Sequence, residues 1–290
     1  MNKRNLFIAV LAAGTIALSG CSKKEGSLIV NIEGLPNLGP NYAYEGWLTG
    51  NGDAKTAGIF TVNDAGEMSS NMFDIKEKDI DKAKAYILTI EPYPDSDPKP
   101  SSVHIIGGDF NGSTATLSVA HGTALGNDFT SATGNYILAT PTDGGSGTDE
   151  LSGVWWLDPA TGPGPGLTLP GLPSGWTYEG WAVIDGIPVT TGKFLSATGA
   201  DQSSPYSGPV PGPPFPGEDF LTNAPAGLTF PTDLSGKTVV ISIEPNPDNS
   251  PMPFSLKPLV GNVPNPATDH MLYQMTNNAA ATNPTGTVSR

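Results

Sequence analysis

The chain has 290 residues, of which only 14% are charged, and it contains 36 glycines and 29 prolines. Many turn-forming residues between short apolar runs favour an all-β protein of one large or two ordinary domains. The formal charge of −14 at pH 7 disfavours nucleic-acid binding, because such binding depends on lysine and arginine side chains that meet phosphates.

The first 20 residues are typical of a secretory signal peptide. A basic start, MNKR, precedes the apolar run LFIAVLAAGTIAL, which is too short to span a bilayer. The string LSGC at residues 18–21 resembles the lipobox of bacterial lipoproteins. This resemblance implies cleavage before Cys21 and attachment of lipid to that residue. Cys21 is the only cysteine, so the chain cannot form an intramolecular disulfide.

Residues 21–27, CSKKEGS, would form a short polar tether behind the lipid. Loss of Lys3 and Arg4 with the signal peptide changes the formal charge from −14 to −16. Such a charge disfavours docking on anionic lipid, so the acyl chains would provide the membrane anchor. Ser22 stands where an aspartate would resemble an inner-membrane retention signal. We therefore expect a cell-envelope protein on the outer membrane, at its periplasmic or surface face.

Short sequence blocks recur in the same order in two parts of the chain. The matched blocks are GLP at 34–36 and 171–173, YEGW at 44–47 and 178–181, AGIF at 57–60 with TGKF at 191–194, and ILTIEPYPDSDPKP at 87–100 with VISIEPNPDNSPMP at 240–253. An ordered set of this kind predicts a tandem duplication. We expect two β-sandwich-like modules, at residues 28–126 and 171–276, joined by bridging strands and loops at 127–170. Residues 277–290 are expected to form a flexible tail.

Local patterns refine this expectation. Alternating residues such as Tyr86, Leu88 and Ile90 predict strands with one buried and one wetter face. Only residues 76–85 carry a helix signal. The prolines of residues 203–228 exclude a central strand or a helix, so this part of the second module is expected to be an extended loop. The apolar side chains expected to hold the loop against the body are Phe215, Phe220 and Leu221.

The repeated blocks resemble the extracytoplasmic C-terminal domain of anti-sigma-K factors. In that family a strand with a tryptophan precedes a small-Gly-x-Phe strand, and a later strand ends in Glu-Pro before a proline-rich turn and a glycine. The likeness covers residues 41–108 and 176–261. It implies the β module and a part in envelope sensing. It does not imply capture of a sigma factor, because the sigma-binding helical domain and transmembrane helix of membrane anti-sigma factors have no counterpart here.

Residues suited to catalysis are scarce, so an enzyme is not expected. His104, His121 and His270 lie far apart in the sequence and lack the spacing of metal ligands. The repeated acids are the best candidates for a specific role. They are Glu45, Glu91, Asp95 and Asp97 in the first module, and Glu179, Glu244 and Asp248 in the second.

These acids have a functional and a structural interpretation. Glu91, Asp95 and Asp97 would offer oxygen ligands to Ca²⁺, and paired carboxylates would serve acid-dependent hydrolysis. In the structural interpretation, which we favour, the aspartates form tight turns. The glutamates, two of which share a strand face with Trp47 or Trp181, then accept hydrogen bonds from the backbone or from a tryptophan or tyrosine. No cofactor is expected in that case.

Trp155 and Trp156 are adjacent, so in a strand their side chains must lie on opposite faces. One is expected in the core, and the other beneath the proline-rich loop or on the surface as a platform for sugar or peptide. The sequence thus favours a lipid-anchored, non-catalytic binding or sensing protein of the envelope. A surface glycan- or peptide-binding lipoprotein and an acid-dependent hydrolase are the alternatives.

Overall fold

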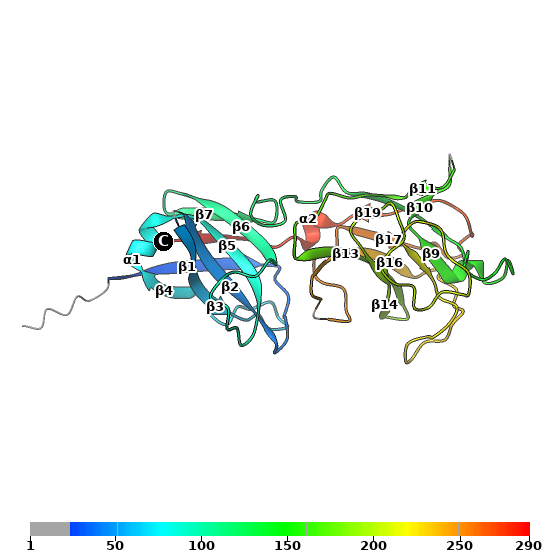
Figure 1. The fold of residues 1–290 in the computed structure, drawn as a ribbon, viewed down its shortest axis with the longest axis horizontal. Helices are drawn as coiled ribbons and strands as arrows, with labels where there is room; N and C mark the ends of the chain where they lie inside the picture. Colours follow the sequence, from blue (N-terminus) through cyan, green and yellow to red (C-terminus); the bar gives the residue numbers. More distant parts are fainter. Residues whose placement is uncertain (1–23, 51, 161, 249) are drawn as a thin grey trace, which may run out of the picture.

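The computed structural model describes residues 24–290 except 51, 161 and 249. The expected signal peptide and Cys21 lie outside the described residues. The described chain forms two lobes in line, both built from strands (Figure 1). Helices are limited to α1 (Glu77–Lys82), α2 (Ala279–Thr282) and a 3-10 turn, so the predicted all-β class is confirmed. Within the described part, no helix is long and apolar enough to cross a bilayer.

The first lobe is one antiparallel sheet of eight strands in the order β3-β2-β5-β6-β7-β20-β1-β4. Their bounds are β1 Glu25–Glu33, β2 Tyr42–Gly50, β3 Gly52–Phe60, β4 Met72–Lys76, β5 Ala83–Pro92, β6 His104–Asn111, β7 Thr114–Ser118 and β20 Thr285–Ser289. The two edge strands approach each other, because a Cβ atom on Gly58 of β3 would lie 2.1 Å from the Phe73 ring of β4. The sheet therefore curls into a barrel-like layer around its own core.

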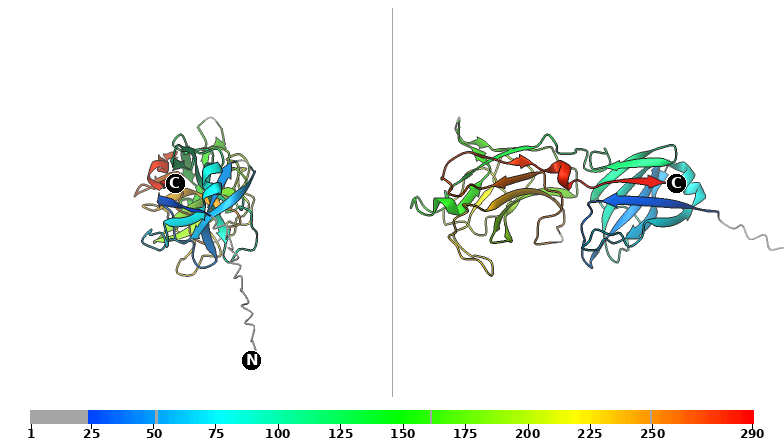
Figure 2. Two further views of the ribbon diagram at one scale, coloured as in Figure 1. Left: turned by 90° about the vertical axis from the view of Figure 1, so that its left-hand side faces the viewer. Right: turned by 180° about the vertical axis from the view of Figure 1, so that it is seen from behind.

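The predicted flexible tail is wrong, because β20 lies inside the first lobe. It hydrogen-bonds to β1 on one side and to β7 on the other, which satisfies its backbone groups in both directions. Val288 is fully buried, and the Arg290 guanidinium donates to the carbonyl oxygens of Ile80 and Ala83. Seen from behind, β20 runs beside β1 (Figure 2). The first lobe thus needs a strand from the far end of the sequence.

The second lobe contains two five-stranded sheets. One has the order β14-β13-β16-β17-β19, and the other runs β12-β8-β9-β15 with β18 paired to β8. A small hairpin, β10 with β11, completes the lobe. The bounds are β8 Thr133–Leu138, β9 Gly153–Trp155, β10 Leu157–Asp158, β11 Gly164–Pro165, β12 Leu167–Thr168, β13 Trp176–Ile184, β14 Ile187–Phe194, β15 Gly217–Asp219, β16 Thr238–Pro245, β17 Leu259–Asn262, β18 Tyr273–Gln274 and β19 Thr276–Asn277. Residues 127–170, where a bridge was predicted, therefore supply three of the five strands of the second sheet (β8, β9 and β12), while β15 and β18 come from later in the chain.

Residues 203–228 follow the expected irregular course apart from the three-residue strand β15. That strand pairs only with β9, at the edge of its sheet. Phe215 and Phe220 are buried as predicted, and Leu221 is half-buried. The loop is therefore attached to the second lobe through its aromatic side chains.

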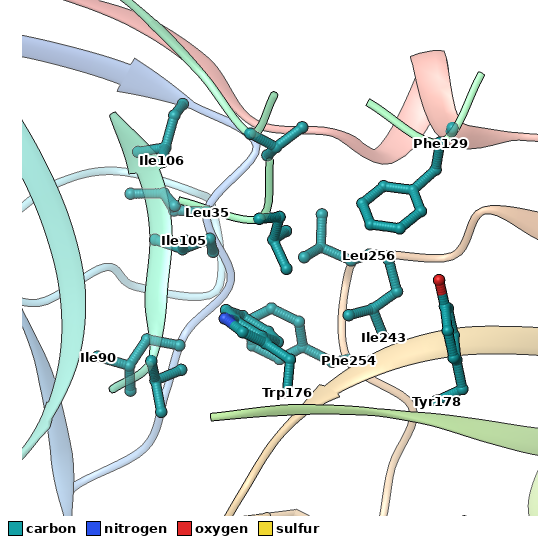
Figure 3. Packing of buried hydrophobic residues seen from close by; sticks show 14 of the residues in the cluster. Leu35, Ile90, Ile105, Ile106, Phe129, Trp176, Tyr178, Ile243, Phe254 and Leu256 are labelled. Atoms are coloured by element: carbon teal, nitrogen blue, oxygen red, sulfur yellow. The ribbon is translucent and has the colours of Figure 1, made fainter. Parts of the chain in front are cut away.

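The two lobes share a continuous core. Trp176, at the start of β13, packs edge-on against Phe254 and lies near Ile105 of the first lobe (Figure 3). The Trp176 Nε1–H donates to the His104 carbonyl oxygen at 3.1 Å. Apolar burial and a directional hydrogen bond thus fix the lobes against each other.

The central strands are buried on both faces, which differs from the predicted wetter face. In β5, Ile87, Thr89 and Glu91 are as buried as the alternate core residues. Trp47 of the neighbouring β2 explains the difference, because its buried indole lies over this face and bonds to Thr89. This second face carries the repeated acids.

Candidate functional site

The strands that carry YEGW have matching neighbours in the two lobes. β2 pairs with β3 and β5, while β13 pairs with β14 and β16, all antiparallel. Each register shifts directly after the glycine of YEGW, between Gly46 and Trp47 and between Gly180 and Trp181. The shift is typical of a β-bulge whose extra residue lies in the partner strand, since Ala57 of β3 and Thr191 of β14 have no opposite residue in the register.

Both glycines lie beneath a large ring. A Cβ atom on Gly46 would lie 2.2 Å from the Tyr86 hydroxyl, and one on Gly180 would lie 2.5 Å from the Trp156 ring. A side chain at either position would displace a buried aromatic, which explains why a glycine stands in the middle of each strand.

The first lobe contains a buried chain of hydrogen bonds that begins at Trp47. Its Nε1–H donates to Thr89 Oγ1 at 2.8 Å, and the Thr89 hydroxyl donates to Glu91 Oε1. The Ser101 backbone N–H also donates to Glu91 Oε1, at 2.8 Å. We call Trp47, Thr89 and Glu91 the first relay. It ties β2 to β5 and to the turn that follows β5.

The second lobe contains the same arrangement. Trp181 Nε1–H donates to Ser242 Oγ at 2.8 Å, and the Ser242 hydroxyl donates to Glu244 Oε1. The Phe254 backbone N–H donates to Glu244 Oε1 at 2.8 Å. We call Trp181, Ser242 and Glu244 the second relay. In both relays a hydroxyl stands between the indole and the carboxylate, whereas the sequence suggested direct contact.

Beside the second relay, three carboxylates gather around one lysine. Oxygen atoms of Glu179, Glu244 and Asp248 lie within 4.8 Å of one another. Lys193 Nζ lies 2.9 Å from Asp248 Oδ2 and 3.9 Å from Glu179 Oε2. The Thr190 hydroxyl donates to Glu179 Oε1 at 2.5 Å. The ammonium of Lys193 thus pairs with two of the three carboxylates and acts as their counter-ion.

Burial sets the acidity of this cluster. It raises the pKa of Glu244 to about 7, against the hydrogen bonds from Ser242 and Phe254 that lower it. Burial also raises the pKa of Glu179, while the Thr190 hydrogen bond and Lys193 act in the opposite direction. Glu244 therefore titrates near neutral pH, beside the carboxylates of Glu179 and Asp248.

The corresponding acids of the first lobe have no lysine. In the β2–β3 register Glu45 faces Ile59, whereas Glu179 faces Lys193 in the β13–β14 register. The pKa of Glu45 is raised by burial first, and by the neighbouring carboxylates of Glu91 and Asp95. The acidic face of the first lobe is thus left without a built-in cation.

The predicted Ca²⁺ ligands do not converge. Glu91, Asp95 and Asp97 form no carboxylate cluster within 4.8 Å, and only the group around Glu179 does so in the described ranges. Asp95 accepts from the Asp97 backbone N–H, and Asp97 accepts from the Lys99 N–H. These are turn contacts, as the structural interpretation of the aspartates predicts.

The tryptophan pair divides between two cores. Trp156 lies in the main core, and Trp155 belongs to a small cluster with Ile137 and Phe215. A Cβ atom on Gly212 would lie 2.4 Å from the Trp155 ring, so the proline-rich loop covers this ring. Trp155 Nε1–H donates to Asp219 Oδ1 at 2.6 Å.

Three acids that sequence analysis did not select hold the proline-rich loop: Glu218 and Asp219 are fully buried, and Asp201 is half-buried. Asp201 accepts from the Gly217 N–H, Glu218 from the Ser207 hydroxyl and Asp219 from the Thr142 N–H. Burial raises the pKa of Asp201 to about 7 and of Glu218 to about 8. No ion pair reaches any of the three in the described parts of the chain. In the sequence, the only signal for this group is the acidic pair Glu218 and Asp219 inside FPGEDF. Asp201 is distant from that pair in the sequence, and the fold brings it close.

A hollow of about 330 Å³ opens beside this loop. Its lining includes Asp201, Gln202 and Ser203, together with Trp155 and Phe215, which are only 4% and 8% exposed. The three histidines lie elsewhere, and each contacts its own partner: His104 the Thr123 carbonyl, His121 Asp109 and His270 Asp269.

Comparison of the chain with protein-family models, with curated proteins and with solved structures finds no match.

Proposed function

We propose that this chain is a lipid-anchored cell-envelope protein that binds or senses without catalysis. The observation that carries the proposal is the way in which the repeated glutamates are hydrogen-bonded. Glu91 and Glu244 each commit one oxygen to a tryptophan-linked hydrogen-bond chain and to a backbone N–H. Groups held in this way stabilise strands, whereas a catalytic carboxylate needs an oxygen directed at a substrate.

The proposal includes a tandem duplication as the origin of the two relay-bearing sheets. Several features support it: the shared registers, the bulge in the strand that pairs with each YEGW strand, the two relays, and a pair of tyrosine hydrogen bonds. The Tyr44 hydroxyl donates to the Pro36 carbonyl, and the Tyr178 hydroxyl to the Pro170 carbonyl. By this geometry the counterpart of Pro36 is Pro170, three residues before the proline of the second GLP.

Envelope location and the anti-sigma-K-like module belong to the same proposal. The support for location is the lipobox-like LSGC with the chain's single cysteine. The support for the module is the ordered set of YEGW, small-Gly-x-Phe and Glu-Pro blocks. The proposed role is therefore sensing or binding in the envelope, with no sigma factor held by this chain.

Two measurements test this proposal. The first is mass spectrometry of the mature protein, which should show a diacyl- or triacyl-modified residue 21, while Cys21→Ser yields an unlipidated precursor that is released from membranes. The second uses Glu91→Gln with Glu244→Gln. We expect this double variant to melt at a different temperature and to recover the same envelope partners in a pull-down. Lost partner binding at unchanged stability would contradict a structural role for the acids.

The hollow beside the proline-rich loop favours a second candidate, binding of a glycan. Carboxylate, amide and hydroxyl groups of Asp201, Gln202 and Ser203 line this hollow, and such groups recognise the hydroxyls of a sugar. Gln202→Ala and Ser203→Ala change the rim without touching the buried Trp155. Glycan-array binding that disappears in both variants, with an unchanged melting temperature, would establish this candidate. Array binding that is absent, or that survives both changes, would exclude this hollow.

A further inference from the structure

The end of the first lobe that holds α1 differs from the rest of the molecule in charge. Six lysines, Arg290 and six acids gather there, which gives a formal charge of +1. Besides Arg290 they are Lys24, Lys55, Lys76, Lys78, Lys82 and Lys84, with Glu25, Asp53, Asp74, Glu77, Asp79 and Asp81. The remaining described residues carry 4 basic and 22 acidic side chains, a formal charge of −18. We call this weakly positive region the α1 end.

The fold, and not the sequence alone, brings these lysines together. The Glu77 N–H donates to the Lys24 carbonyl oxygen at 3.0 Å, which places α1 beside the start of β1. Lys24, Lys76 and Lys78 line one shallow hollow with Glu77, and Lys55 and Lys82 line a second. The lysines are exposed; the Lys24 side chain is 81% accessible. They form the extremity of the first lobe from which β1 begins (Figure 1).

The position of Cys21 fixes which surface would meet a membrane. This step rests on the proposed function, because it takes Cys21 as the lipidated residue. Three peptide units separate Cys21 from Lys24, and a chain spans at most about 3.6 Å per residue, or roughly 11 Å in all. Lys24 must therefore lie within roughly 11 Å of the lipidated residue, and the end of the lobe that holds Lys24 and α1 is the part nearest to the membrane.

We propose that the α1 end is a membrane-docking surface whose lysines contact the phosphates of anionic phospholipid headgroups. Lys76, Lys78, Lys82 and Lys84 have long side chains that reach such phosphates while α1 stays outside the bilayer. An anionic membrane repels the formal charge of −18 on the remaining described chain. Attraction at one end and repulsion along the rest would hold the long axis away from the membrane and present the second lobe to the envelope space. The total charge of the chain disfavours such docking, but it does not reveal that the excess of acids lies outside the α1 end.

The test uses full-length lipidated protein in vesicles of phosphatidylcholine alone or with phosphatidylglycerol. The chain's only natural cysteine carries the lipid, so an introduced cysteine can be labelled uniquely. Asp81→Cys places a donor dye on α1, and Ala160→Cys places one on the exposed β10–β11 hairpin of the second lobe. Energy transfer to an acceptor lipid should be strong from position 81, stronger still with phosphatidylglycerol, and weak from position 160.

Matched charge reversals complete the test. Lys76→Glu with Lys78→Glu should remove the phosphatidylglycerol-dependent gain at position 81. Lys99→Glu with Lys257→Glu, which changes the net charge equally elsewhere, should leave that gain intact. Equal transfer at position 81 in both vesicle types, or stronger transfer from position 160, would overturn the docking surface. Flotation separates this outcome from failure of the anchor: a protein that does not float with vesicles contradicts lipidation, whereas one that floats without the expected transfer contradicts only docking.

Discussion

Glu244 gives the sharpest expectation for how this protein responds to pH. Its side chain is 1% exposed, and burial raises its pKa from an ordinary 4.5 to about 7. A carboxyl whose pKa is higher in the folded than in the unfolded chain stabilises the fold while both forms are protonated. That stabilisation is fully present below about pH 4.5 and is lost as the pH rises through about 7.

The magnitude follows from the two pKa values. Ionising a group whose pKa differs by this amount between the folded and unfolded chains costs about 3 kcal/mol. For a chain of this size, about 1 kcal/mol lowers the melting temperature by roughly 2–4 °C, so Glu244 should lower it by roughly 6–12 °C between pH 5 and pH 9. Asp201 and Glu218 act with the same sign, because burial raises the pKa of both.

Glu244→Gln isolates this contribution. A glutamine oxygen accepts from Ser242 and Phe254 as Glu244 Oε1 does, and the amide cannot ionise. Calorimetry from pH 4.5 to pH 9 should show a falling melting temperature for the wild type and a shallower fall for the variant. The exposed Glu33→Gln serves as a control for charge alone and should follow the wild type. A wild-type melting temperature that is flat or rises over this range would refute the reasoning, as would an equal fall in Glu244→Gln.

Three further changes test separate contacts. Trp47→Phe keeps the ring but removes the N–H that bonds to Thr89, and should lower the free energy of unfolding in urea by about 1–2 kcal/mol. Val288→Asp places a carboxylate at a fully buried position of β20. We therefore expect proteases to cleave at β1 and β7, the neighbours of β20, while the second lobe stays intact. Equal resistance of both lobes to proteolysis would contradict the placement of β20. Ile59→Lys should supply the missing ammonium beside Glu45 and raise the melting temperature at pH 8 but not at pH 4, an effect that 1 M salt should weaken.

The sequence predicts the repeated parts of the fold well, because the residue pattern within each half is enough to identify its strands. Period-2 alternation identifies β5 and β16, and the helix signal at 76–85 coincides with α1. The glycine in each YEGW predicts close approach of an aromatic, which Tyr86 and Trp156 provide. These features depend on neighbours that are close in sequence or present twice.

Contacts that join distant segments could not be predicted in this way. β20 is short and polar apart from Val288, and only the two open edges of β1 and β7 make it a strand. Asp201 and Glu218 meet because the proline-rich loop returns to β9 through β15. The residues of a short segment do not show which distant segments it will contact. For this reason the composition of residues 277–290 alone leads to the wrong assignment of a flexible tail.

The hydrogen bonds of the second relay determine which oxygen of Glu244 carries the proton. Glu244 Oε1 already accepts from the Ser242 hydroxyl and the Phe254 N–H, so the proton of neutral Glu244 belongs on Oε2. The carboxyl therefore loses its proton from Oε2 without breaking the bonds to Ser242 and Phe254, and the new charge lies close to the carboxylates of Glu179 and Asp248. Ionisation should loosen the turn that holds Asp248 before it disturbs β13 and β16. The relay keeps the sheet intact over the same pH range in which the cluster changes charge, so a structural hydrogen-bond chain and a pH-dependent turn can share one glutamate.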